Sequence, residues 1–265
     1  MTPFLSINAE GRTSRNLQAE NSLQAVFYDL SPAVFAFSTC RSGGVSRGAY
    51  ASMNVNPYCG DVPADVSENR RRLSAWLGTE NILLPHQVHG TRVAFVAGGE
   101  NLEGYDALVT QQARLCICVS TADCIPILLY DAETKSVAAV HAGWRGTAAR
   151  IVEKVIAEMT ARLGTRPSAL RAVIGPGISL EAFEVGDEVY EAFRAADFPM
   201  QRIARRMERW HIDLWEANRW QLQQLGVEDV QVSGICTYNN ADRFFSARRL
   251  GTESGRILNG IMLKP

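Results

Sequence analysis

Two histidines and one cysteine form the strongest chemical pattern in the sequence. His89 follows His-Gln-Val, Cys124 lies in Thr-Ala-Asp-Cys-Ile-Pro, and His141 ends an apolar run. Two imidazoles and one thiolate can hold zinc and leave a fourth position open, as catalytic zinc sites require. The separations from residue 89 to 124 and from 124 to 141 are too wide for a compact zinc finger. We therefore expect a site assembled from distant strands.

Two other interpretations of the same residues stay open. A Cys124 nucleophile with His141 as its base would make a hydrolase or amidase, which needs a thiolate of lowered pKa and no metal. Alternatively, the three residues would form a structural clamp in a binding protein without enzymatic activity. Metal analysis with a turnover assay separates these interpretations. Metal with turnover indicates a metalloenzyme, metal without turnover a clamp, and no metal a thiol hydrolase.

The remaining cysteines and histidines add no second ligand pattern. Cys116 and Cys118 lie two residues apart on a predicted strand, so their side chains share one face. Because their neighbours are apolar, we interpret this pair as core packing. We assign no role to His211 or Cys236.

Arginines beside glycine or aromatic residues are the second group of candidates. Arg41 lies next to a Gly-Gly pair, Arg145 follows a tryptophan, and Arg248 follows Phe-Phe-Ser-Ala. Glycine-rich backbone and a guanidinium fork can bind a phosphate or carboxylate together. We interpret Arg47 and Arg249 as solvated loop residues.

Several familiar motifs are absent or lack their context. The sequence contains no G-x-x-x-x-G-K-[ST] run, which excludes a P-loop nucleotidase. The run from Gly175 to Gly177 lacks the third glycine of a dinucleotide-binding fingerprint. The letters of a nucleophile elbow occur around Ser46, but no helical pattern follows, so we do not expect a nucleophile there.

Composition and charge are those of an ordinary globular protein. Of 265 residues, 46% are hydrophobic and 21% charged, and 27 Lys and Arg against 28 Asp and Glu give a formal net charge of -1. This balance excludes intrinsic disorder and argues against nucleic acid as a partner, because no basic excess is available to neutralise phosphates. No apolar run approaches the roughly 20 residues of a membrane helix, so we expect no membrane association.

The N-terminal segment and the cysteines indicate the cellular compartment of the protein. Residues 1–24 are polar and lack the apolar core of a signal peptide, so we expect a loosely ordered lead-in. Six cysteines without a secretion signal indicate free thiols rather than a disulfide scaffold. These features predict a cytoplasmic protein. Residues 25–265 contain no linker and are expected to form a single domain.

The candidate residues require a scaffold of strands followed by mixed elements. Hydrophobic periodicity predicts helices over residues 65–77, 146–164, 186–195 and 212–225. Strands are predicted at 25–28, 33–39, 92–96, 107–110, 115–120, 126–130, 136–141, 170–174 and 230–235, with a loop at 236–249 and a tail at 256–263. This succession predicts an α+β fold in one domain, with a mixed β-sheet or sandwich core flanked by helices.

The segments around the candidate ligands resemble a known family. The runs His86-Gln-Val-His-Gly90, Thr121-Ala-Asp-Cys-Ile-Pro126 and Ala139-Val-His-Ala-Gly-Trp-Arg-Gly146 are similar to motifs of the YfiH-like proteins. This family is also called the laccase-domain or multicopper polyphenol oxidase family and, more recently, purine nucleoside phosphorylase. Further similar segments are Ser38–Ser46, Ile174–Ile178, Asp242–Arg249 and Gly255-Arg256. The resemblance covers about residues 25–263, and the glycine at position 177 departs from it, because many members have a cysteine there.

The resemblance implies a fold, a cofactor and an activity. It implies an α+β fold and a zinc site formed by His89, Cys124 and His141, with His86 outside the ligand set. The implied activity is phosphorolysis of adenosine, inosine, guanosine and methylthioadenosine, with adenosine deamination alongside. An older description of the family implies copper-dependent oxidation of phenols. Because multicopper oxidases need many histidines and this chain has four, we favour zinc, with copper as the alternative cofactor.

The implied phosphorylase activity suggests roles for the other candidates. Catalytic roles are expected for Cys124, His141 and Asp123. Phosphate must approach the anomeric carbon of the ribose, where a guanidinium can hold it bidentately, and amide or carboxylate groups can bind the ribose or base. The expected substrate-binding residues are Arg41, Asn54, Arg145 and Arg248. Purine nucleosides and phosphate are the expected partners, and the expected state is a monomer or weak homodimer.

Overall fold

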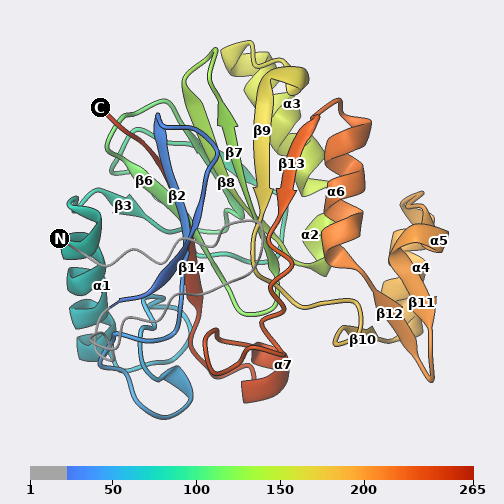
Figure 1. Ribbon diagram of the computed structural model, residues 1–265, viewed down its shortest axis with the longest axis horizontal. Helices are drawn as coiled ribbons and strands as arrows, with labels where there is room; N and C mark the ends of the chain where they lie inside the picture. The colour runs from blue at the N-terminus through green and yellow to red at the C-terminus, as the bar shows by residue number, and fades with distance from the viewer. Residues whose placement is uncertain (1–22) are drawn as a thin grey trace.

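The computed structural model describes residues 23–265 and arranges them in four layers (Figure 1). Helix α1 (Pro63–Leu77) covers one face of a five-stranded sheet, whose other face packs on a six-stranded sheet. Helices α3 (Ile151–Leu163) and α6 (Leu214–Gln224) cover the far face of the second sheet. The predicted lead-in over residues 1–24 lies outside the described residues up to position 22.

The two sheets contain parallel and antiparallel neighbours. The five-stranded sheet consists, in spatial order, of β1 (Ala25–Tyr28), β2 (Val34–Thr39), β14 (Ile257–Leu263), β6 (Cys116–Thr121) and β3 (Ile82–Leu83). The six-stranded sheet consists of β13 (Asp229–Val232), β9 (Leu170–Ile174), β7 (Ile125–Asp131), β8 (Ser136–Ala142), β5 (Ala107–Thr110) and β4 (Val93–Phe95). Three pairs, β3–β6, β4–β5 and β9–β13, are parallel, and the others are antiparallel. The predicted α+β fold with a mixed sheet or sandwich core is therefore confirmed.

Shorter elements surround these layers. The third sheet has the order β10 (Glu184–Val185), β12 (Trp210–Ile212) and β11 (Ala204–Arg206). The other helices are α2 (Trp144–Ala148), α4 (Asp187–Ala195), α5 (Met200–Ile203) and α7 (Ala247–Leu250), with 3-10 turns at Gly48–Tyr50 and Pro167–Ala169. Within residues 23–265, none of the helices has both the length and the hydropathy that crossing a bilayer demands.

Strand β6 shows why the central strands are apolar along their whole length. Ile117 and Val119 pack between the two sheets, whereas Cys116 and Cys118 pack on the side of α1. Both faces of the strand are therefore buried, which favours a nearly continuous hydrophobic run. The prediction that the cysteine pair belongs to the core is confirmed.

Two predicted helices differ from the structure at their N-terminal ends. The helix expected over residues 146–164 is divided into α2 and α3, because Arg150 adopts a left-handed conformation with a φ of 62°. The helix expected from residue 212 begins after Asp213, whose carboxylate accepts a hydrogen bond from the Glu216 amide at 2.9 Å. Ile212 belongs to β12 instead.

The C-terminal region contains the largest difference from the predicted elements. The segment expected to be a tail over residues 256–263 is β14, which lies between β2 and β6 in the five-stranded sheet. The loop expected over residues 236–249 ends in the first residues of α7. Strand β14 was not predicted because its partners are distant in sequence and its pattern is interrupted by Asn259 and Gly260.

Candidate metal centre and adjoining cavity

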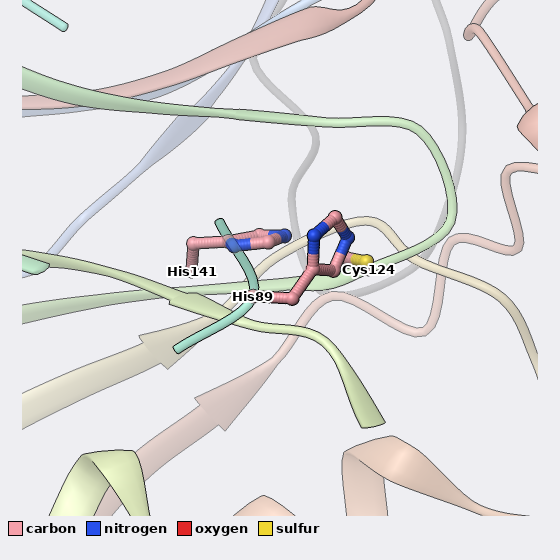
Figure 2. A group of neighbouring side chains, drawn as sticks. All are labelled: His89, Cys124 and His141. Atoms are coloured by element: carbon pink, nitrogen blue, oxygen red, sulfur yellow. The ribbon is translucent and has the colours of Figure 1, made fainter. Parts of the chain in front are cut away.

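Three side chains from separate parts of the chain converge at one end of the two-sheet sandwich. His89 lies in the loop before β4, Cys124 lies in the turn between β6 and β7, and His141 lies on β8. Their ligand atoms all lie within 4.8 Å of one another, and the two imidazole centroids are 4.8 Å apart with planes at 75°. Figure 2 shows both imidazoles beside the Cys124 sulfur. Two nitrogens and one sulfur are donor atoms that could hold a metal ion, and three protein ligands leave a further position on the metal open.

Tight backbone turns present two of these three residues. Cys124 lies where the chain crosses from β6 in one sheet to β7 in the other, next to Asp123, whose φ is 83°. His89 itself has a φ of 59°. Positive φ is uncommon outside glycine and often occurs at functional sites. The turn at Cys124 and the loop at His89 thus place this thiol and this imidazole at the same end of the sandwich.

Asp106 holds both histidines in place. The Asp106 carboxylate lies 2.8 Å from Nδ1 of His141, and it accepts hydrogen bonds from the amides of His89 at 2.9 Å and Gly90 at 2.7 Å. Burial by itself would raise the pKa of Asp106, but His141 and the backbone amides of Gly90 and Val88 lower it below its usual value. Because an ionised carboxylate only accepts, Nδ1 of His141 donates and Nε2 is left to bind a metal.

Gly143 leaves the space that the cluster occupies. A Cβ atom at this position would lie 3.1 Å from Sγ of Cys124 and 3.1 Å from Cδ2 of His89. The φ of Gly143 is -66°, which any residue can adopt, so the requirement for glycine is steric. This close approach explains the glycine two residues after His141.

The charges within the cluster favour a thiolate before any metal binds. Burial alone would raise the pKa of the Cys124 thiol, but His141 and His89 lower it to about 6. Burial alone would lower the pKa of His141, but the thiolate of Cys124 and the carboxylate of Asp106 raise it to about 9. At neutral pH the metal-free pair is therefore a thiolate and an imidazolium. A thiolate is the form that binds zinc, and it is also the form that a thiol hydrolase would use.

The cluster opens into a cavity of about 530 Å³. This volume is in the range of small-molecule binding sites. Besides the three candidate ligands, its walls include the rings of Tyr58, His86 and Phe183 and the cationic residues Arg248 and Arg256. The cavity therefore combines a metal-binding end, flat apolar surfaces and positive charge.

Asp123 connects the cluster to α7. One carboxylate oxygen accepts a hydrogen bond from the Thr237 hydroxyl at 2.6 Å, and the other accepts one from the Arg248 amide at 2.7 Å. The Asp123 carbonyl also accepts from the Ile178 amide at 2.9 Å. Asp123 therefore determines where Arg248 meets the cavity.

Comparison with known proteins agrees with this architecture. Residues 35–264 match the family model described as multi-copper polyphenol oxidoreductase laccase. The chain belongs to this family. A purine nucleoside phosphorylase from Bacteroides thetaiotaomicron is 46% identical over 244 residues, which cover 86% of this chain and 90% of that protein. An adenosine deaminase from an unknown prokaryotic organism is 41% identical over 248 residues, covering 87% of this chain and 94% of that protein.

Solved structures of similar proteins share the fold. YlmD from Geobacillus stearothermophilus has a TM-score of 0.84 and 33% identity, covering 88% of this chain and 93% of that one. A protein from Bacillus licheniformis, described as hypothetical protein YfiH, also has a TM-score of 0.84, with 29% identity over 90% of this chain and 99% of its own. The four-layer arrangement is therefore shared over nearly the whole described chain.

In this member of the laccase family, the cavity brings together five of the sequence-predicted site residues. They are His89, Asp123, Cys124, His141 and Arg248, and all of them line the cavity. The two rings, the thiol and the carboxylate come from the turns and strand ends that the sequence pattern indicated. Their roles in binding and catalysis stay predictions.

Three other predicted residues do not line the cavity. The guanidinium of Arg41 donates hydrogen bonds to the carbonyls of Ala51 at 2.7 Å and Ala241 at 2.6 Å. Asn54 is fully buried and accepts from the Arg256 amide at 3.1 Å. Arg145 lies over the ring of its neighbour Trp144, 4.2 Å from the centroid. The structure thus engages these three side chains in protein contacts elsewhere.

Two residues of the site were missed by the sequence reasoning. Asp106 directly precedes a fully buried apolar strand, and a carboxylate in that place needs partners, which was an available signal. Gln87 lies between the two histidines of the His-Gln-Val-His run. Its side chain donates to the Ser120 carbonyl at 2.9 Å and accepts from the Ser120 amide at 2.7 Å. The Gln87 side chain therefore links the loop that carries His89 to the end of β6 by hydrogen bonds.

Proposed function

We propose that this chain is a zinc-dependent purine nucleoside phosphorylase acting on adenosine, inosine, guanosine and methylthioadenosine, with adenosine deaminase activity. Relatives named purine nucleoside phosphorylase and adenosine deaminase, matched over most of their length, support nucleoside chemistry. The observation that carries the proposal is the cavity of about 530 Å³ shared by the metal-ligand cluster and Arg248. Phosphorolysis of an N-glycosidic bond is favoured when one cavity holds a group that stabilises the leaving purine, a site for the nucleobase and a site for phosphate.

The residues of the cluster fit zinc. Zinc accepts nitrogen and sulfur ligands, and three protein ligands leave a position open for catalysis. Asp106 leaves Nε2 of His141 free for the metal, and Gly143 leaves the space between the ligands clear. Bound by His89, Cys124 and His141, zinc would supply a Lewis acid to stabilise negative charge on the leaving purine.

Arg248 is the proposed phosphate-binding residue. Its guanidinium has the planar fork that holds phosphate bidentately, and its amide is fixed by Asp123. Arg256 lines the same cavity and adds a second positive charge. Phosphate held there can attack the anomeric carbon as positive charge develops on the ribose.

A copper-dependent polyphenol oxidase is the second candidate, because the family description names this activity. Several copper centres would require many histidines. The chain has four, of which two belong to the cluster. His86 pairs with Glu103, and Nδ1 of His211 lies 2.9 Å from the Leu180 carbonyl. Over residues 23–265, the cluster is the sole group of three or more metal-ligating side chains within reach of one ion, which favours zinc.

Product analysis with zinc-loaded, copper-free protein tests the proposal. With phosphate present, adenosine should yield adenine and ribose 1-phosphate in equal amounts. Without phosphate, adenine release should stop, whereas conversion of adenosine to inosine should continue. A zinc form that is inert, together with phenol oxidation after copper loading, would establish the oxidase instead. Hydrolysis of amide substrates by the metal-free protein would support the thiol hydrolase.

A further inference from the structure

Tyr58 presents an exposed aromatic face at the wall of the cavity. Its ring is stacked on that of His86, with centroids 4.3 Å apart and planes at 26°. Both residues line the cavity, yet 52% of Tyr58 is exposed to solvent. An aromatic ring in this position provides a flat apolar surface for a ligand.

The segments that carry the two rings are anchored to the same residue of β6. The side chain of Asn56 accepts a hydrogen bond from the Tyr58 amide at 2.7 Å and donates one to the Ser120 hydroxyl at 2.9 Å. On the other side, Gln87 is hydrogen-bonded to the backbone of Ser120 through both ends of its amide. The stack is therefore held from two directions by the end of one buried strand.

A carboxylate and backbone hydrogen bonds fix His86 beneath Tyr58. Nδ1 of His86 lies 2.6 Å from Oε1 of Glu103. The His86 amide donates to the Leu102 carbonyl at 3.1 Å, and its carbonyl accepts from the Gly104 amide at 3.0 Å. His86 thus has a defined orientation from which it supports one face of the Tyr58 ring.

The stack lies within reach of the candidate metal centre. His86 precedes His89 by three residues, so their Cα atoms are separated by about 11 Å at most. Arg248 lines the same cavity. A ligand that places an aromatic base on Tyr58 can therefore keep an edge of the base toward the metal cluster and extend its sugar toward the phosphate-binding residue.

We propose that Tyr58 stacks on the purine base of the substrate and sets its position. This inference rests on the proposed nucleoside activity and adds to it the residue that receives the base. Stacking is tolerant of base identity, because every base has a π face. It therefore suits a site that accepts adenine, hypoxanthine and guanine nucleosides alike. Tyr58 is a base-positioning residue, with His86 as its support.

Steady-state kinetics of zinc-loaded Tyr58→Leu and Tyr58→Phe test the inference. Leucine keeps an apolar side chain but removes the π face, so KM for adenosine should rise by about 5- to 150-fold. Inosine and guanosine should show similar increases, whereas KM for phosphate should not change. Phenylalanine keeps the π face and is the matched control, with every KM expected within about twofold of the wild-type value.

The outcomes distinguish this inference from the function on which it rests. Unchanged KM for adenosine in Tyr58→Leu, with phosphorolysis intact, would overturn base stacking and leave the proposed function standing. A wild-type protein that neither binds nor cleaves nucleosides would overturn both. Zinc content and circular dichroism establish that the variants fold. Tyr58→Gln, a polar replacement suited to an exposed position, provides a second variant with the same expected rise in KM.

Discussion

The carboxylate of Asp106 lies 2.8 Å from Nδ1 of His141, and both side chains are buried. A second pair of the same chemistry lies nearby, since Nδ1 of His86 is 2.6 Å from Oε1 of Glu103, but this pair is exposed. His141 belongs to the candidate metal cluster and His86 does not. The two pairs therefore allow the contribution of a carboxylate to metal binding to be measured against a matched control.

Asp106→Asn is expected to weaken zinc binding by about 10- to 100-fold, the usual effect of removing a partner of a metal-bound histidine. Asparagine preserves the shape of the side chain but supplies no negative charge to His141. Glu103→Gln changes the exposed pair and should leave zinc affinity within about twofold. Competition with a chromophoric chelator measures both affinities. Equal zinc affinity in the two variants would contradict the role of Asp106.

Cys124→Ala is expected to remove most of the bound zinc while the protein stays folded, because a thiolate ligand is lost. Cys59 lines the same cavity but lies outside the cluster, and its sulfur contacts Asn54 instead. Cys59→Ser is therefore the matched control and should retain zinc. Metal analysis after dialysis provides the measurement. Full zinc content in folded Cys124→Ala would show that the three residues are not the metal site.

Zinc affinity is expected to rise with pH. In the metal-free protein the pKa of Cys124 is about 6 and that of His141 about 9. Between these values the thiolate is ready to bind, but His141 must release a proton, so affinity should increase about tenfold per pH unit. Below about pH 6 the thiol must also lose its proton, and the dependence should become steeper. Chelator competition at a series of pH values measures it, and an affinity independent of pH would contradict the assignment of these ligands.

Arg248→Lys is expected to raise KM for phosphate by about tenfold while changing KM for nucleosides little, because lysine keeps the charge but loses the bidentate fork. Arg41→Lys is the matched comparison. The Arg41 guanidinium donates to two backbone carbonyls outside the cavity, so its replacement should instead lower the free energy of unfolding by about 1–2 kcal/mol. Phosphate-saturation kinetics and urea denaturation separate the two effects. A larger loss of phosphate affinity in Arg41→Lys would reverse this assignment.

Gly143→Ala is expected to disturb the cluster without unfolding the chain. The added methyl group would meet Cys124 and His89 at 3.1 Å, which forces these side chains apart. We expect a loss of zinc affinity together with an overpacking cost of about 1–3 kcal/mol in stability. Thermal denaturation with and without zinc measures both effects. Wild-type zinc affinity in this variant would show that the cluster has room that the structure does not indicate.

The candidate ligands could be predicted from the sequence because their chemistry is rare. The chain has four histidines, which narrowed the choice, and the resemblance of the segments around His89, Cys124 and His141 to family motifs made these three the expected ligands. Asp106 could not be found in this way, since the chain has many carboxylates. Its role depends on the pairing of β5 with β8, which places residue 106 beside residue 141. Such pairing is a long-range property that local patterns do not contain.

The arginines show that long-range contacts also limit the prediction of binding residues. A guanidinium near a glycine-rich loop predicts an anion site, but the sequence does not show which carbonyls lie within reach of it. Arg41 meets the carbonyl of Ala241, 200 positions away in the chain. Arg248 meets the cavity because Asp123 holds its amide.

The strands could be predicted more closely than the binding residues. Strands β5 and β9 match their predicted ranges, because the alternation and burial of apolar residues are local signals.

The position of strand β14 constrains the order in which the five-stranded sheet can form during synthesis. It lies between β2 and β6, although the ribosome synthesises it after both. Until residues 257–263 emerge, the two earlier strands have no partner to join them, and the apolar faces of the first sheet stay uncovered. The turn that carries Cys124 leaves from the end of β6, so β14 also supports the strand that precedes one of the candidate metal ligands. Nascent chains are therefore expected to depend on chaperone protection until β14 is complete.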